Sequence, residues 1–106
     1  MYNSLTREAF GEVFEKGKKK HFKDLTLIVL KDGGARFRFG VCFKRKAPPN
    51  VRNKAKRRIR SILSPLVSRM EHGLNLVISI TPDAASTEFV TLKDSLLKAL
   101  KETGLM

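Results

Sequence analysis

The sequence contains one cysteine, Cys42, and no tryptophan among its 106 residues. A single cysteine excludes an intrachain disulfide and is typical of a protein in a reducing compartment, so we expect a cytoplasmic location with no disulfide partner. The longest strongly apolar run covers residues 25–30, which is far too short to cross a bilayer. The first residues have no apolar stretch behind a basic start, so we also expect no signal peptide.

Acidic residues are few, with ten Asp and Glu against twenty-two Lys and Arg, and the net charge is +12. The acids are spread along the chain, without the cluster that holds two metal ions in protein nucleases. His21 and His72 are isolated, and Gly33-Gly34 lacks the downstream glycine and lysine of a phosphate-binding loop. Cys42 lies within an expected strand and fits a small, partly buried residue better than a nucleophile. We therefore expect no catalytic residue and no metal site in the protein itself.

The rest of the composition is typical of one globular domain whose positive charge is concentrated in the middle of the chain. Hydrophobic residues make up 42% of the chain, too many for a disordered protein, and no repeat or linker divides residues 1–106. Residues 16–60 carry a net charge of +15, whereas the rest of the chain carries −3. This distribution indicates a polyanionic partner, which is either nucleic acid or an anionic membrane.

Hydrophobic periodicity gives the expected order of helices and strands. Helices are predicted over 6–17, from 51 to about 66, and over 91–104; strands are predicted over 25–31, 35–44 and 74–80. Residues 18–24 form a basic connector with room for one short extra strand. This order predicts an α+β fold, a small two-layer α/β sandwich in the order α-β-β(-β)-α-β-α.

Local signals predict where these elements turn and end. Residues 32–34, Asp-Gly-Gly, predict a hairpin turn between the first two long strands. Asn50 is expected to cap the second helix, and Thr91 with Asp94 is expected to form a capping box for the last one. Ser64-Pro65 predicts a break or kink in the second helix.

The strand at 35–44 alternates regularly between two kinds of side chain. Phe37, Phe39, Val41 and Phe43 point to one face, and Arg36, Arg38 and Lys44 point to the other. The pattern predicts a sheet with one buried face and one partly cationic face.

The strongest functional signal is segment 50–60, NVRNKAKRRIR, which holds six basic residues and no acid. An apolar stripe of Val51, Ala55, Ile59, Ile62 and Leu66 predicts that this helix packs on a core, so its charges are held on a fixed surface. A membrane-surface helix would place Trp or Phe opposite its charges, which this stripe lacks. A helix-turn-helix would be all-α, whereas this helix lies between two strands, so RNA is favoured over DNA.

The string RNKAKRRIR at 52–60 resembles the signature Arg-Asn-x-x-Lys-Arg-x-x-Arg of the bacterial ribonuclease P protein family. Arg52, Asn53, Lys56, Arg57 and Arg60 match it, and a lysine takes the place of the usual arginine at position 54. Four segments are similar to parts of the family in the same order: its first helix, the strand that ends in a Lys/Arg cluster before the signature, its late strand and its final helix. They are LTREAFGEVFEKGK, RFGVCFKRK, LNLVISITP and SLLKALKETGLM.

The resemblance implies a protein cofactor of a catalytic RNA, one that needs no catalytic residue of its own. With Mg²⁺, bound mainly by the RNA, this RNA removes the 5′ leader of precursor tRNA; the holoenzyme is thus an endoribonuclease. The protein would bind both the catalytic RNA and the leader. The resemblance also implies a left-handed strand-helix-strand crossover through the signature helix, against the usual right-handed rule.

Two groups of site residues follow from these observations. RNA contact is expected from the signature helix and from the basic residues before it: Arg52, Asn53, Lys54, Lys56, Arg57, Arg60, Lys44, Arg45 and Lys46. Leader binding is expected from the first helix and the sheet: Phe10, Phe14, Ile28, Arg36 and Arg38. Helical spacing alone fits Phe10 and Phe14 equally well to core packing. Two rival functions remain, a structural RNA-binding protein of ribosomal type and a self-sufficient nuclease.

Overall fold

The computed structural model describes residues 5–22, 25–31, 37–69, 73–81 and 88–104. The predicted α+β class is confirmed, and the basic connector contains the short extra strand. In chain order the elements are α1 (Arg7–Lys16), β1 (Lys18–His21), β2 (Leu25–Lys31), β3 (Arg38–Phe43), α2 (Pro49–Leu63), the 3-10 helix η1 (Ser64–Arg69), β4 (Leu74–Ile80) and α4 (Phe89–Glu102).

The four strands form one mixed sheet in the order β1-β2-β4-β3. β4 pairs antiparallel with β2 and parallel with β3, and α2 lies in the crossover from β3 to β4. The predicted hairpin between the second and third strands is wrong, because β4 lies between them; residues 32–34 themselves fall outside the described part. All seven residues of β4 are buried, so this strand occupies the centre, and the lysine-rich β1 takes an edge.

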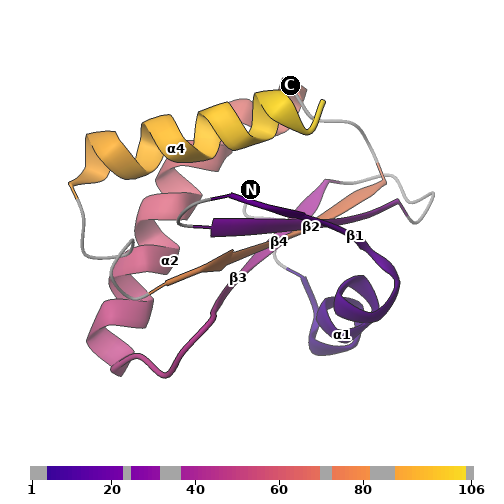
Figure 1. The fold of residues 1–106 in the computed structure, drawn as a ribbon, viewed down its shortest axis with the longest axis horizontal. Coiled ribbons are helices and arrows are strands. Elements are labelled where there is room, and N and C mark those ends of the chain that lie inside the picture. Colours follow the sequence, from indigo (N-terminus) through magenta and orange to yellow (C-terminus); the bar gives the residue numbers. More distant parts are fainter. Residues whose placement is uncertain (1–4, 23–24, 32–36, 70–72, 82–87, 105–106) are drawn as a thin grey trace.

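Helices cover both faces of the sheet (Figure 1). α2 and α4 lie on one face, over a main core that includes Phe39, Leu76 and Leu96. α1 lies against the other face, where Val13, Ile28 and Val77 form a second, smaller buried cluster. The face predicted as partly cationic is therefore in part a second apolar interface.

The first helix begins and ends near the predicted residues. The Oγ1 of Thr6 accepts a hydrogen bond from the Ala9 N–H at 3.2 Å, so Thr6 caps α1 as predicted. α1 ends at Lys16, and the Gly17 N–H donates to the Val13 carbonyl at 2.8 Å.

The predicted caps of the other two helices are wrong. α2 begins at Pro49, one residue before Asn50, because proline has the helical φ already set and needs no donor in the first turn. α4 begins at Phe89 after Glu88, so Thr91 lies inside the helix and no side-chain cap is formed. The predicted break at Ser64-Pro65 is confirmed: α2 ends at Leu63 and continues as η1, because proline cannot donate to the preceding turn.

Candidate nucleic-acid interface

α2 divides into a buried side and a cationic side. Ala55, Ile59 and Ile62 are fully or almost fully buried, which confirms the apolar stripe of the sequence. On the opposite side five of the predicted contact residues are exposed: Arg52, Asn53, Lys54, Lys56 and Arg57. The buried stripe fixes the helix on the sheet, so these side chains project from a rigid base.

Arg58 and Arg60 lie at the border between the two sides of α2. Both are half-buried, which fits aliphatic stems lying along the apolar stripe, and the Nε of Arg60 is itself buried. Arg60 is a predicted RNA contact, and it is less accessible than Arg57, which is exposed.

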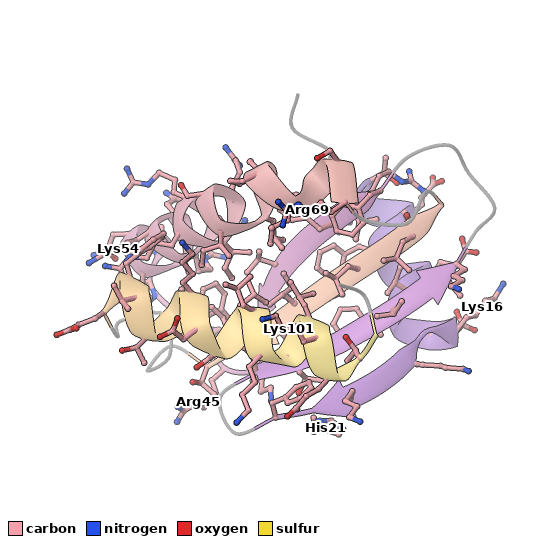
Figure 2. The ribbon with its side chains drawn as sticks, turned by 90° about the horizontal axis from the view of Figure 1, so that it is seen from above. Lys16, His21, Arg45, Lys54, Arg69 and Lys101 are labelled. Carbon is pink, nitrogen blue, oxygen red and sulfur yellow. The ribbon has the colours of Figure 1, made fainter. Side chains whose placement is uncertain are left out.

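The end of β3, the following loop and the first turns of α2 enclose a groove of about 850 Å³, here called the signature groove. It is lined by Val41, Cys42, Phe43, Lys44, Arg45, Lys46, Ala47, Pro48, Arg52 and Lys56. The groove thus brings together five of the nine predicted RNA contacts, from two separate parts of the sequence. Figure 2 shows Arg45 and Lys54 at the same end of the molecule.

Hydrogen bonds fix the loop that carries these cations at both of its ends. The Lys44 N–H donates to the Ile80 carbonyl at 3.0 Å, which extends the β3–β4 pairing into the loop. The Arg52 N–H donates to the Pro48 carbonyl at 3.0 Å, which closes the first turn of α2. Charges that are exposed on an ordered backbone can meet an ordered array of phosphates without a large loss of conformational entropy.

The apolar side chains of the signature groove are not predicted by the sequence pattern. Val41 and Phe43 pack against the main core, as the alternation predicts, yet both are only half-buried and also line the groove. Their position directly before the basic loop was the available signal. Burial raises the pKa of the Cys42 thiol, although the hydrogen bond with Ser79 and the charge of Lys44 act in the opposite direction. Burial thus disfavours the thiolate form of Cys42, which is the reactive form of a cysteine.

The predicted leader-binding residues divide between surface and core. Phe14 is 38% exposed, and its ring stacks on that of Phe10 with centroids 5.6 Å apart. Phe10 is half-buried and rests directly on Gly40 of β3, where only a residue without a Cβ leaves room for the ring. Ile28 is only 2% exposed beneath α1, so its prediction as a leader contact is wrong for this conformation: it is part of the second core.

Arg38 lies on the same face of the sheet as α1, in accordance with the predicted alternation. It is half-buried, and its Nε donates to the Oδ1 of Asn75 at 3.1 Å, across the β3–β4 pair. Arg36, the other predicted arginine, lies outside the described residues.

Neither a metal cluster nor a membrane span is found in the described ranges. Within them no group of three or more His, Cys, Asp or Glu residues is placed to hold a metal ion. No helix of the same ranges is long and apolar enough to cross a bilayer.

Comparison with known proteins gives a consistent result. The family model described as Ribonuclease P matches residues 3–104. The ribonuclease P protein component of Microcystis aeruginosa is 33% identical, over 88% of this chain and 86% of that protein. The one from Pseudanabaena is 29% identical, over 94% and 89% of the two chains.

Solved structures show the same architecture. The RNase P protein from Thermotoga maritima superposes with a TM-score of 0.80 at 25% identity, covering 96% of this chain and 97% of that one. The Staphylococcus aureus RNase P protein gives a TM-score of 0.85 over 99% and 97% of the two chains, and at 20% identity it supports the fold alone.

Proposed function

The chain belongs to the ribonuclease P protein family, and from this membership we propose the contacts through which it acts. It is the protein subunit of ribonuclease P, a ribonucleoprotein enzyme of tRNA 5′ processing whose hydrolase activity comes from the RNA. The proposal therefore concerns binding and positioning, with residues 1–106 acting as a single RNA-binding domain in the cytoplasm.

We propose that the exposed side of α2 and the signature groove bind the catalytic RNA. The observation that carries this proposal is the convergence of Lys44, Arg45 and Lys46 with Arg52 and Lys56 around one groove. Asn53, Lys54, Arg57 and Arg60 continue the same surface along the helix. Lysine and arginine on a rigid surface bind structured RNA through phosphate oxygens and release condensed counterions, which supplies affinity without reading the base sequence.

We propose that the 5′ leader of precursor tRNA lies against the other face of the sheet, beside α1. An exposed phenylalanine offers a stacking surface to an unpaired base, and Phe14 has that exposure, supported from behind by Phe10. Arg38 and Arg36 would supply cations for the leader backbone. Ile28 is not part of this proposal, because it is buried.

The donor set of the described residues does not fit a protein-held metal ion, since it contains no cluster of carboxylates, imidazoles or thiols. We propose, from membership of the family, that the catalytic RNA binds the Mg²⁺. The protein's part is to bring cations to the RNA and to hold the substrate, and no step of the hydrolysis passes through a side chain of this chain.

The test is cleavage of precursor tRNA by a bacterial ribonuclease P RNA at low Mg²⁺, with and without this protein. We expect a cut at the mature 5′ end that depends on the protein, because added cations lower the need for Mg²⁺ to neutralise phosphates. Tight RNA binding without any stimulation of cleavage would contradict the proposed role and favour a purely structural RNA-binding protein.

Replacing Phe14 with alanine is expected to reduce the preference of the holoenzyme for precursor over mature tRNA. Loss of one stacked base is worth about 1–3 kcal/mol, so the ratio of the two dissociation constants should fall by about 10-fold. The measurement is the binding of both RNAs to holoenzyme assembled with each variant.

Phe89 provides a matched control, because it is also 38% exposed but lies at the start of α4. Phe89→Ala should leave the precursor preference unchanged. Equal losses in the two variants would exclude a specific stacking role for Phe14.

A further inference from the structure

A second cationic groove lies at the edge of the sheet formed by β1. It has a volume of about 670 Å³ and is called here the edge groove. Five lysines line it, with an apolar floor and the end of α4 as a wall: Lys16, Lys18, Lys19, Lys20, Lys31, Leu27, Val29, Leu30, Glu102, Thr103 and Gly104. Glu102 is the one acidic residue among these lining residues.

The strand register aims two of these lysines into the groove. Lys18 is opposite Val29 and Lys20 is opposite Leu27, and directly opposed residues of antiparallel strands point to the same face. Leu27 and Val29 pack in or against the main core, on the side of α4, so Lys18 and Lys20 also point to that side. Lys31 shares this face by the period of two along β2.

Protection of a sheet edge explains only part of this arrangement. Lysines on an edge strand hinder pairing with a second chain, and all four residues of β1 are exposed. However, Lys16 comes from the end of α1 and Lys31 from the end of β2, and neither belongs to the edge strand. Three separate elements thus direct positive charge at one concave surface, which is the arrangement of a binding site for an anion.

The edge groove is separate from the signature groove, with which it shares no lining residue. The signature groove lies along β3 and the edge groove along β1, and these two strands form the opposite edges of the sheet. In the order β1-β2-β4-β3, three inter-strand spacings of about 4.8 Å separate the two edges by roughly 14 Å. This exceeds the screening length of about 8 Å at physiological salt, so the charges of one groove are largely screened from those of the other. Figure 2 shows Lys16 at the opposite end of the molecule from Arg45 and Lys54.

The chemistry of the edge groove fits a phosphodiester backbone better than a lipid surface. A membrane-binding surface would present protruding apolar side chains beside its cations. The exposed large hydrophobic residues of the described ranges are Phe14, Phe89 and Val90, and none of them lines this groove. A concave surface with an apolar floor and a lysine rim instead fits a strand whose phosphates meet the rim.

We propose that the edge groove binds the phosphate backbone of a second RNA segment, with Lys18 and Lys20 as its main contacts. The proposal rests on the assignment of the chain to an RNA enzyme and adds a second contact at the opposite edge of the sheet. The protein then bridges two RNA segments, one at each groove. The second segment belongs either to the catalytic RNA or to the body of the tRNA.

The test is the double variant Lys18→Gln/Lys20→Gln, with Lys93→Gln/Lys98→Gln as control. The control removes the same charge from two exposed lysines of α4 that line neither groove. Binding is measured between 50 and 300 mM KCl for the protein with a bacterial ribonuclease P RNA, and for the holoenzyme with mature tRNA. At 0.15 M salt the edge variant should bind one of these RNAs about 10- to 30-fold more weakly, and its salt slope should be lower by about 1.5.

The outcomes separate this inference from the proposed function. A change with the ribonuclease P RNA alone identifies the catalytic RNA as the second segment, and a change only with tRNA identifies the substrate. If wild-type protein binds and stimulates cleavage but both double variants behave alike, the edge groove is not an RNA site.

Dimerisation of the edge variant in size-exclusion chromatography, with normal RNA binding, would assign these lysines to edge protection. Wild-type binding to anionic vesicles that is lost in the edge variant, with RNA binding intact, would likewise overturn the proposal.

Discussion

Replacing Arg52, Lys56 and Arg57 with glutamine is expected to weaken binding to the catalytic RNA about 100-fold at 0.15 M salt. All three side chains are exposed on α2, and two of them line the signature groove. Each lost phosphate contact should also lower the salt slope by about 0.7–0.9, so the slope of the variant should be lower by about 2–3. The measurement is a salt titration of the dissociation constant.

The fold should survive this substitution. Glutamine has nearly the same helix propensity as lysine and arginine, and removal of three neighbouring like charges relieves repulsion along the helix. Thermal unfolding is therefore expected within a few degrees of wild type. Lys93→Gln/Lys98→Gln/Lys101→Gln removes the same charge from exposed positions on α4 and serves as control. Equal losses of affinity in the two triple variants would show that net charge alone, and not this surface, drives binding.

Gly17→Ala is expected to destabilise the protein by about 3 kcal/mol, towards the upper end of what overpacking costs. A Cβ at this position would lie 2.4 Å from the Val13 carbonyl oxygen and 3.0 Å from that of Val29, as well as 2.9 Å from the Cγ2 of Ile28. Two of these atoms belong to the backbone and cannot turn away as a flexible side chain would. The measurement is the free energy of unfolding in urea.

Gly11→Ala is the opposing control. Nothing lies within 4 Å of a Cβ at Gly11, and the residue is inside α1, so alanine should stabilise the protein by roughly 1 kcal/mol through helix propensity. An unchanged stability of Gly17→Ala would mean that α1 can move away from β2 without cost. Since α1 carries Phe10 and Phe14, a folded Gly17→Ala protein should lose precursor preference before it loses affinity for the catalytic RNA.

The sequence predicted those features that depend on local periodicity. The apolar stripe from Val51 to Ile62 identified the buried side of α2. The basic residues outside the stripe then identified its cationic side. The alternation around Phe39 and the apolar positions of α4, such as Leu96, also agree with the structure. Each of these patterns depends only on residues within one helix or strand. A short window of the sequence contains all of those residues, so the pattern can be read directly.

Features that depend on pairing between distant elements were not predictable in this way. The strand that would expose the most apolar surface at an edge of the sheet is the most stable in its interior. This strand is β4, because side chains on both of its faces are buried. That placement separates β2 from β3 and removes the expected hairpin. The burial of Ile28 has the same origin, because it follows from the packing of α1 across β2 and β4, which no local pattern encodes.

The parallel pairing of β3 with β4 has a consequence for how the chain reaches its native state. The two strands can pair only after the intervening residues have closed a loop, and Arg38 meets Asn75 across a separation of 37 residues. Such non-local pairing slows folding, because the entropy of closure is lost before the contacts form. Since α2 is itself the crossover, its cationic surface reaches its place on the sheet only when β3 and β4 pair. A partly folded chain with only β1 and β2 paired therefore has the lysines but no assembled signature groove, and it is expected to associate with RNA only weakly and without preference for one site.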